Sequence, residues 1–416
     1  MKGAKVLIFE DSKNRNNVNS LANSFYLCEY KTIIQMKNIH SQNFKIGILG
    51  GGQLGRMTLL EGYNLNLQID ILDPSLKAPC KNLANEFVVG DFKNYEDVYA
   101  FGKDKDVVSI EFEDVNSDAL AQLEKEGVKV FPQPHILKII QDKGLQKQFY
   151  TDHNLPTSKF QFINNKEEIA NSNLNFPVFQ KLRTSGYDGY GVQRIDSKEE
   201  LSKAFDKPSI IEEGVDLDKE LSVIIARNEK GEIKYFPLVE LEFNPKANMV
   251  EFLFSPANVS DAVAEKAYSL ATTLIKELQM VGLLAVELFL NKKGEVLINE
   301  IAPRAHNSGH QSIEGNYTSQ FAQHLRAILN LPLGDTDIKV PSVMLNLLGE
   351  ENANGTAHYE GFEAILEQKG VYPHLYGKEQ VKPFRKMGHI TILDDDLDKA
   401  KVKAKYIKTI VKVTSK

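Results

Sequence analysis

The stretch INEIAPRAHNSGH, residues 298–310, gathers groups that could bind an anion and a metal within thirteen residues. It carries the carboxylate of Glu300, the guanidinium of Arg304 and the imidazoles of His306 and His310, directly after a hydrophobic strand. A guanidinium fork matches a planar oxyanion, and a neutral imidazole beside it can take up a proton. The turn is therefore predicted to hold an anion. For His310, a packed core histidine is an open alternative.

Glu287, in the segment LLAVELFL, is the expected partner of Glu300. If residues 291–294 form a four-residue loop, Glu287 lies opposite Ile298, and Glu300 is its diagonal neighbour on the same face. Two carboxylates among apolar neighbours repel each other unless a cation lies between them. Mg²⁺ (or Mn²⁺) bridging to nucleotide phosphates is the predicted occupant. The alternative is a pair of solvent-facing glutamates, because a loop one residue longer or shorter would place them on opposite faces.

The segment KLRTSGYDGYGVQ contains three glycines within six residues, which is typical of a flap whose backbone amides fold over phosphates. Lys181 lies just before it, and Lys143 lies in a predicted long helix at 134–153. Downstream, Glu212 and Glu213 end a strand that could present backbone groups to adenine, and Glu220 could bind ribose hydroxyls. Each feature alone is commonplace, since surface lysines and glycine turns usually have no ligand. Their order ahead of the carboxylate pair favours a nucleotide site.

A second glycine motif, GGGQLG, follows the strand KIGIL near the N-terminus. Gly50, Gly52 and Gly55 satisfy the pattern G-x-G-x-x-G, and Asp73 follows at the distance expected for a ribose contact. Alone, the motif indicates either an NAD-dependent oxidoreductase or a purely structural turn, because the same turn occurs in many βαβ units.

Composition limits the possible partners. The net charge of −6 argues against a nucleic-acid partner, although it allows small phosphorylated ligands. The longest apolar run, VGLLAVELFL, contains a glutamate, so no membrane span is expected. Cys28 and Cys80 form no metal motif and are expected to be reduced cytosolic thiols.

The elements that must position these groups follow an α/β pattern, with α+β character in parts. Strand and helix patterns predict a parallel sheet to about residue 135, followed by the long helix, hairpin-like strands and a helix near 260–280. At 416 residues, two or three domains are expected. The expected segments are an Asn-rich leader with no fold of its own at 1–43, a parallel-sheet domain at 44–140, a central domain at 141–350 and a small C-terminal domain at 351–416.

This order of features resembles the ATP-grasp superfamily. Within it, GGGQLGRM, RTSGYDGYG, INEIAPRAHNSGH and KPFRKMGH resemble 5-(carboxyamino)imidazole ribonucleotide synthase of purine biosynthesis, from about Phe44 to the C-terminus. The resemblance implies an ATP-grasp fold with an N-terminal Rossmann-like domain and a small C-terminal domain. It implies a cytoplasmic homodimeric ligase that uses ATP and bicarbonate to carboxylate the exocyclic amine of 5-aminoimidazole ribonucleotide through carboxyphosphate.

The resemblance also implies a role for each matching residue. Arg304, His306 and Asn307 would hold bicarbonate at the catalytic centre, and Glu287 and Glu300 would bind the metal. ATP would be held by Lys143, Lys181, Ser185, Gly186, Tyr187, Asp188, Gly189, Tyr190, Gly191, Glu212, Glu213, Gly214, Val215, Glu220, Asn299 and Glu300. The aminoimidazole nucleotide would contact Gln53, Leu54, Glu111, Tyr187, Asp188, Lys378, Arg385 and Lys386.

A few positions differ from the commoner family pattern. Tyr190 stands where YDGRG has arginine, Lys143 where QDR is usual, Phe243 where a histidine is frequent, and KPFRK replaces RPGRK. These changes concern nucleotide contacts and leave the carboxylate pair and the anion turn intact. Three other functions stay open: another ATP-grasp ligase, such as a formate-dependent glycinamide ribonucleotide transformylase or a biotin carboxylase; an NAD-dependent oxidoreductase; and a non-catalytic ATP-binding regulator.

Overall fold

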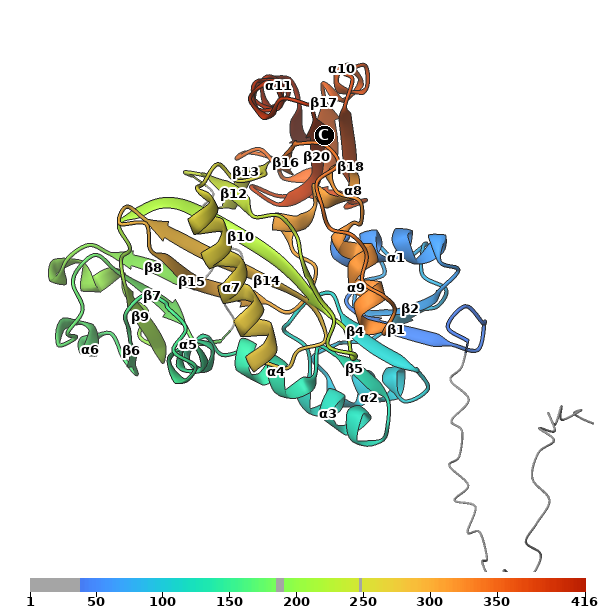
Figure 1. Ribbon diagram of the computed structural model, residues 1–416, viewed down its shortest axis with the longest axis horizontal. Helices are drawn as coiled ribbons and strands as arrows, with labels where there is room; N and C mark the ends of the chain where they lie inside the picture. Colours follow the sequence, from blue (N-terminus) through green and yellow to red (C-terminus); the bar gives the residue numbers. More distant parts are fainter. Residues whose placement is uncertain (1–37, 185–190, 247–248) are drawn as a thin grey trace, which may run out of the picture. The chain divides into compact units, whose positions relative to one another are not determined.

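The computed structural model describes residues 38–184, 191–246 and 249–416. The first part of this range forms a five-stranded parallel sheet with strand order β3-β2-β1-β4-β5 (Figure 1). Short apolar strands suit this sheet because helices cover its faces. The predicted parallel sheet is confirmed. Its elements are β1 (Lys45–Leu49), α1 (Gln53–Asn64), β2 (Gln68–Asp73), β3 (Phe87–Val89), α2 (Tyr95–Gly102), β4 (Val107–Ile110), α3 (Ser117–Lys125) and β5 (Lys129–Phe131).

The predicted long helix at 134–153 is wrong, because the chain forms two helices there. α4 (Pro134–Ile140) ends before Gln141, and α5 (Lys143–Asp152) starts afresh. Asp142 separates them: its carboxylate accepts hydrogen bonds from the amides of Gly144 and Leu145 and pairs with Arg183 at 2.5 Å. Aspartate is a strong N-cap because its side chain satisfies amides that begin a helix. The break makes Lys143 the first residue of α5.

A four-stranded antiparallel sheet of order β6-β9-β7-β8 follows α5. The predicted flap lies between β7 and β8. Of the flap residues 185–191, only Gly191 is described. The predictions for Ser185, Gly186, Tyr187, Asp188, Gly189 and Tyr190 concern residues outside the described ranges, and so does the prediction for Cys28. The elements here are β6 (Phe160–Ile163), α6 (Glu167–Ala170), β7 (Val178–Leu182), β8 (Val192–Ile195), the 3₁₀ helix η1 (Lys198–Lys203) and β9 (Ser209–Glu213).

The largest sheet runs β15-β14-β10-β12-β13-β16-β20-β18, with β11 paired to β10. Alternate residues of β10 and β14 face opposite sides. One side packs on α7 (Asp261–Glu277) and the other on α9 (Gln320–Ile328) (Figure 1). The strands are β10 (Leu217–Arg227), β11 (Ile233–Tyr235), β12 (Val239–Asn244), β13 (Met249–Ser255), β14 (Gly282–Asn291), β15 (Val296–Ala302), β16 (Ser342–Leu348), β18 (Val371–Leu375) and β20 (Lys386–Leu393).

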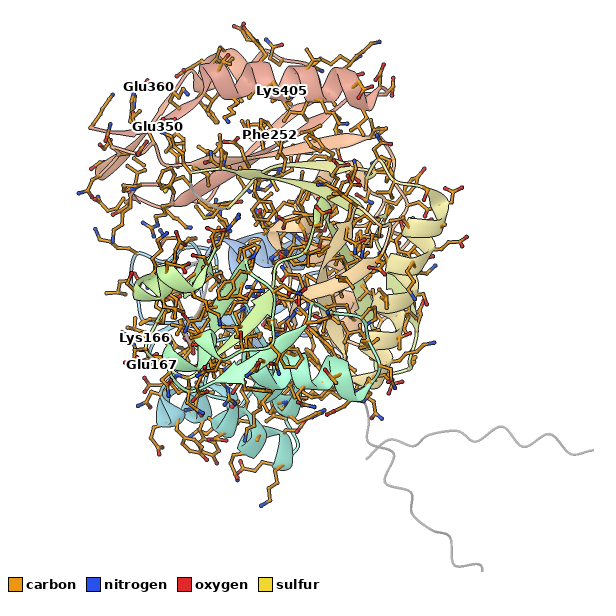
Figure 2. All side chains as sticks on the ribbon, turned by 90° about the vertical axis from the view of Figure 1, so that its left-hand side faces the viewer. Lys166, Glu167, Phe252, Glu350, Glu360 and Lys405 are labelled. Carbon is orange, nitrogen blue, oxygen red and sulfur yellow. The ribbon has the colours of Figure 1, made fainter. Side chains whose placement is uncertain are left out.

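The C-terminal segment joins this sheet rather than standing apart from it. β16 pairs with β13 on one side and with β20 on the other, so the sheet continues past residue 350. α11 packs over it through a core that includes Phe252, while Lys405 on the same helix is exposed (Figure 2). The remaining elements are the 3₁₀ helix η2 (Asn307–Gly309), α8 (Ser312–Gly315), β17 (Gly355–Glu360), α10 (Phe362–Leu366), β19 (Gln380–Val381), α11 (Leu397–Ile410) and β21 (Lys412–Ser415). Across the described ranges, no helix is long and apolar enough to cross a membrane.

Candidate active site

Glu287 on β14 and Glu300 on β15 lie directly opposite each other. The predicted register, with Glu287 opposite Ile298, is wrong: Leu288 pairs with Ile298, and Glu287 pairs with Glu300. The connecting loop is one residue longer than expected, which alone would place the carboxylates on opposite faces. A β-bulge between the two pairs adds Asn299 to β15 and restores the shared face.

The two carboxylates differ in electrostatic environment. Burial, together with the charges of Glu300 and Glu220, raises the pKa of Glu287 to about 8. The charge of Lys143 lowers the pKa of Glu300 to about 2. A charged Glu287 thus needs positive charge nearby. Among the described residues no group of three or more His, Cys, Asp or Glu side chains is arranged to hold a metal. The pair has two carboxylates on one face, and Mg²⁺ in proteins commonly takes one or two.

Of the two predicted phosphate lysines, Lys143 contacts this pair and Lys181 contacts the residue next to Glu300. Lys143 Nζ lies 2.5 Å from Glu300 Oε2, and Lys181 Nζ donates to Asn299 Oδ1 at 3.0 Å. The residue inserted by the bulge therefore contacts a lysine of the four-stranded sheet. The sequence placed Lys143 mid-helix; its position at the first turn of α5 instead directs it to β15.

The residues predicted to bind adenosine, 212–215 and Glu220, are called the hinge residues below. Glu212 is the most buried of the glutamates among them, with 3% of its surface exposed. Its carboxylate pairs with Lys181 at 2.9 Å and Lys147 at 2.8 Å, and it accepts a hydrogen bond from Ser158. Burial would raise the pKa of Glu212, but the two lysine charges outweigh it and hold the pKa well below the usual range. Sequence reasoning missed Lys147. The sequence feature that could have identified Lys147 is its spacing of four residues from Lys143, because this spacing places both lysines on one face of α5.

The other predicted hinge residues adjoin Glu212. Glu213 ends β9, the amide of Gly214 donates to the carbonyl of Pro177 at 2.8 Å, and Val215 follows before β10. Glu220 on β10 lies opposite Phe289 of β14, and burial raises its pKa to about 7. The structure thus brings the hinge, the lysines and the carboxylate pair together.

Arg304 and His306 lie beside the carboxylate pair on the turn after β15. Arg304 forms a two-pronged ion pair with Glu113, with Nε to Oε2 at 2.5 Å and Nη2 to Oε1 at 3.1 Å. His306 Nε2 lies 3.4 Å from Glu287 Oε1. Burial, together with the charge of Arg304, lowers the pKa of His306 to about 3, so the ring is neutral at pH 7.

Asn307 and His310 are held inside the protein. The amide of Asn307 exchanges two hydrogen bonds with Asn346 on β16, at 2.9 and 2.7 Å. His310 is 1% exposed, bonds Gln320 and packs against the ring of His389. The packed-histidine alternative therefore describes His310. Asn346 and Glu113 were missed, because no local pattern links them to the turn.

The N-terminal glycine turn contacts carboxylates of its own chain. The amide of Gly51 donates to Asp73, and the amide of Gly52 donates to Glu111. A Cβ at Gly52 would lie 2.2 Å from Glu111 Oε1, so any other residue there would displace the Glu111 carboxylate. An NAD-dependent oxidoreductase would use the amides of this glycine turn and the carboxylate of Asp73 to bind its cofactor. Here these groups form hydrogen bonds within the chain.

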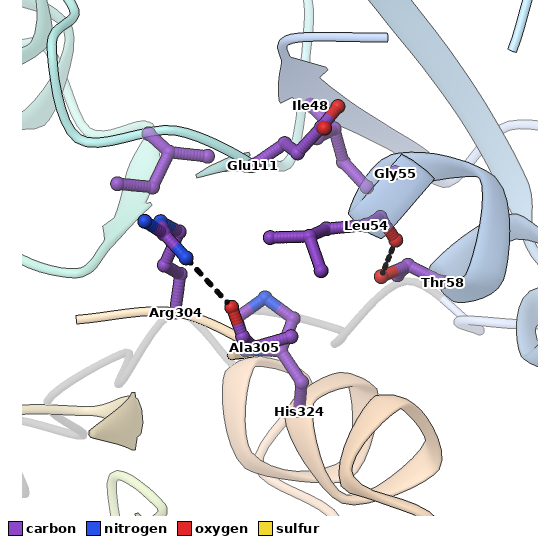
Figure 3. A pocket seen from close by; sticks show the side chains of 9 residues that line it. Ile48, Leu54, Gly55, Thr58, Glu111, Arg304, Ala305 and His324 are labelled. Atoms are coloured by element: carbon purple, nitrogen blue, oxygen red, sulfur yellow. Dashed lines mark hydrogen bonds between the residues drawn. The ribbon is translucent and has the colours of Figure 1, made fainter. Parts of the chain in front are cut away.

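Glu111 and Arg304 line one small cavity of about 10 Å³, room for about one water molecule (Figure 3). Leu54, a predicted substrate residue, lines the same cavity, and Gln53 precedes it as the first residue of α1. Burial raises the pKa of Glu111 to about 7. The walls are completed by Ile48, Gly55, Thr58, Ile110, Ala305 and His324. The cavity thus lies between two residues predicted to contact the aminoimidazole nucleotide, Leu54 and Glu111, and the anion turn at Arg304.

Three basic residues are predicted to contact the aminoimidazole nucleotide: Arg385 and Lys386 end the motif KPFRK at the start of β20, and Lys378 lies between β18 and β19. Lys378 Nζ donates to the carbonyl of Lys386, and Arg385 donates to the carbonyl of Gln380. The charge of Lys386 adds to the lowering of the pKa of His306 and opposes the rise in the pKa of Glu287. Lys386 therefore lies near the turn. Arg385 contacts backbone away from the carboxylate pair.

Three family domains match the chain in succession. These are the ribonucleotide synthetase preATP-grasp domain at 44–141, the ATP-grasp domain at 148–321 and the phosphoribosylaminoimidazole carboxylase C-terminal domain at 342–403. Relatives named phosphoribosylaminoimidazole carboxylase are longer: the chain spans 64% of the one from Vigna aconitifolia.

Several relatives of similar length are named N5-carboxyaminoimidazole ribonucleotide synthase or synthetase. N5-carboxyaminoimidazole ribonucleotide synthase from Bacillus subtilis is 36% identical over 85% of this chain and 92% of its own. The crystal structure of the synthetase from Thermotoga maritima is 40% identical with a TM-score of 0.83, covering 90% of this chain and 100% of that one. The Aspergillus clavatus structure, in complex with ADP and 5-aminoimidazole ribonucleotide, is 34% identical with a TM-score of 0.81, covering 88% of this chain and 98% of that one. The chain therefore belongs to the N5-carboxyaminoimidazole ribonucleotide synthase family of ATP-grasp proteins.

Proposed function

We propose that this protein uses ATP and bicarbonate to carboxylate the exocyclic amine of 5-aminoimidazole ribonucleotide, in de novo purine biosynthesis. Bicarbonate oxygen attacks the γ-phosphoryl group, releasing ADP and forming carboxyphosphate. The amine then takes the carboxyl group, phosphate leaves, and the amine loses a proton. The observation that carries the proposal is the facing pair Glu287 and Glu300, with lysines on one side and Arg304 and His306 on the other.

The lysine side of the pair suits ATP. Lys143 and Lys181 can neutralise phosphate charge as it develops during transfer. The strand end at Glu212 to Val215 offers backbone groups to adenine, and Glu220 offers a carboxylate to the ribose. The ion pairs of Glu212 fix this strand end against α5.

The facing glutamates fit a divalent cation. Oxygen donors are the ligands that Mg²⁺ prefers. Burial and the charges of Glu300 and Glu220 raise the pKa of Glu287, so a bound cation would favour its charged form. Glu287 and Glu300 would hold the ion, with Mn²⁺ a possible substitute. When bound, the ion supplies charge stabilisation to the phosphates.

The other side of the pair suits bicarbonate. Arg304 offers a planar fork to a planar anion, and neutral His306 beside it can take up or pass on a proton. Asn307, held by Asn346, shapes the turn.

The acceptor nucleotide would bind where the N-terminal turn meets the C-terminal strand. Gln53, Leu54 and Glu111 would contact its base and amine, and Lys378, Arg385 and Lys386 would contact its phosphate. Leu54 and Glu111 line the same small cavity as Arg304, which supports a substrate site next to the anion turn. A cytoplasmic location and a homodimer remain predictions, and the Vigna relative is named as chloroplastic.

The direct test measures ADP formation with each reactant omitted in turn. We expect turnover to depend on ATP, bicarbonate and 5-aminoimidazole ribonucleotide together. Stimulation by formate with glycinamide ribonucleotide, or by biotin, would assign the chain to another ATP-grasp ligase. ATP binding without turnover under every condition would indicate a regulator.

A further inference from the structure

Glu113 is the side chain that holds Arg304 in place. Its two oxygens meet Nε and Nη2 of the guanidinium, and Nη1 donates to the carbonyl of Ala305 at 3.0 Å. Both side chains are largely buried, with 14% of Arg304 and 28% of Glu113 exposed. Burial would raise the pKa of Glu113, but Arg304 outweighs it and the net pKa is lowered, so Glu113 is charged at pH 7.

The backbone of Glu113 is itself fixed. The carbonyls of Glu113 and Val115 both accept from Gln141 Nε2 at 2.8 Å, which ties the loop after β4 to the end of α4. Glu111, two residues earlier, bonds the amide of Gly52. One short segment after β4 therefore contacts the glycine turn through Glu111 and the anion turn through Glu113.

A two-pronged carboxylate fixes the plane of a guanidinium as well as its position. An arginine has several rotatable bonds, and ordering it at the moment of binding costs free energy that a preorganised side chain has already lost. Because Glu113 occupies the Nε–Nη2 edge, it decides which way the rest of the guanidinium faces relative to His306 and Glu287.

We propose that Glu113 is a positioning residue that orients Arg304 for bicarbonate, and this inference rests on the proposed function. Glu113 does not touch the anion in this scheme, since like charges repel. It acts through Arg304, and its loss affects bicarbonate more than ATP.

The test is steady-state kinetics of Glu113→Gln, which keeps the side chain's size and one acceptor but removes its charge. We expect the KM for bicarbonate to rise at least tenfold while the KM for ATP changes less than twofold. Glu113→Asp keeps the charge with a shorter reach, and an intermediate KM for bicarbonate is expected. Glu251→Gln is the matched control, because Glu251 is a buried carboxylate paired with Lys408 outside the site.

A double substitution separates positioning from simple packing. In an Arg304→Gln background, adding Glu113→Gln should raise the bicarbonate KM no further, because the residue it acts through is gone. An unchanged bicarbonate KM in Glu113→Gln, a parallel rise in both KM values, or an additive effect in the double variant would each overturn the inference. Absence of bicarbonate-stimulated turnover in the wild type would instead refute the proposed function.

Discussion

Replacing Glu300 with glutamine tests the centre of the proposed site. The change removes one of two facing negative charges and keeps the size of the side chain. For unit charges about 4 Å apart at an effective dielectric constant of about 20, the lost attraction is roughly 4 kcal/mol. That corresponds to about a thousandfold weaker cation binding. Lys143 also loses its partner at 2.5 Å. We therefore expect turnover to fall at least a hundredfold at millimolar Mg²⁺.

The assay follows ADP formation across a Mg²⁺ series and, separately, Mn²⁺ binding by titration calorimetry in the presence of ADP. Circular dichroism should show an unchanged fold. Glu295→Gln is the matched control, because Glu295 is an exposed carboxylate in the loop of the same hairpin, bonded to Asn291. Near-normal turnover in Glu300→Gln, with the Mg²⁺ requirement of the wild type, would refute the metal role of this pair.

Three further predictions concern the surrounding network. Lys147→Met should lower the free energy of unfolding by about 3 kcal/mol, because breaking a buried ion pair leaves Lys181, among the described residues, as the one lysine paired with Glu212. The substitution should also raise the KM for ATP. Denaturant unfolding measures the first effect and steady-state kinetics the second. Gln146→Leu should leave the Ile301 amide without its acceptor and lower the free energy of unfolding by about 1–3 kcal/mol, which thermal unfolding measures. Burial lowers the pKa of His324 to about 4. Its folded state thus binds fewer protons than the unfolded state between about pH 6.5 and 4, and stability should fall as pH drops through this window. A melting-temperature series should show a shallower fall for His324→Asn, and equal slopes would contradict this reasoning.

Local sequence patterns predicted the groups but not all of their partners. The parallel sheet, the carboxylate pair and the phosphate lysines follow from strand patterns and from side-chain chemistry near particular strands. Glu113 and Arg304 are 191 residues apart, and Asn307 and Asn346 are 39 apart, so only tertiary structure joins them. Likewise, Asp142 at the break before Lys143 pairs with Arg183, which follows β7 and is 41 residues away, so the helical periodicity around Asp142 does not reveal the break.

The shared face of Glu287 and Glu300 results from two departures that cancel. The side-chain period of a strand is two, so one extra loop residue reverses the face of everything that follows. The bulge at Asn299 reverses it again, and only for residues beyond it. The core residues Val296 and Ile298 pair with Leu290 and Leu288 in the register set by the longer loop. Glu300 lies beyond the bulge, where the register is shifted by one residue, and pairs with Glu287. Asn299 itself accepts a hydrogen bond from Lys181, so the inserted residue also connects the carboxylate strand to a lysine that we propose binds ATP. The hairpin can therefore bury an apolar stem and still present both acids to one ligand, which a regular ladder with this loop length could not do.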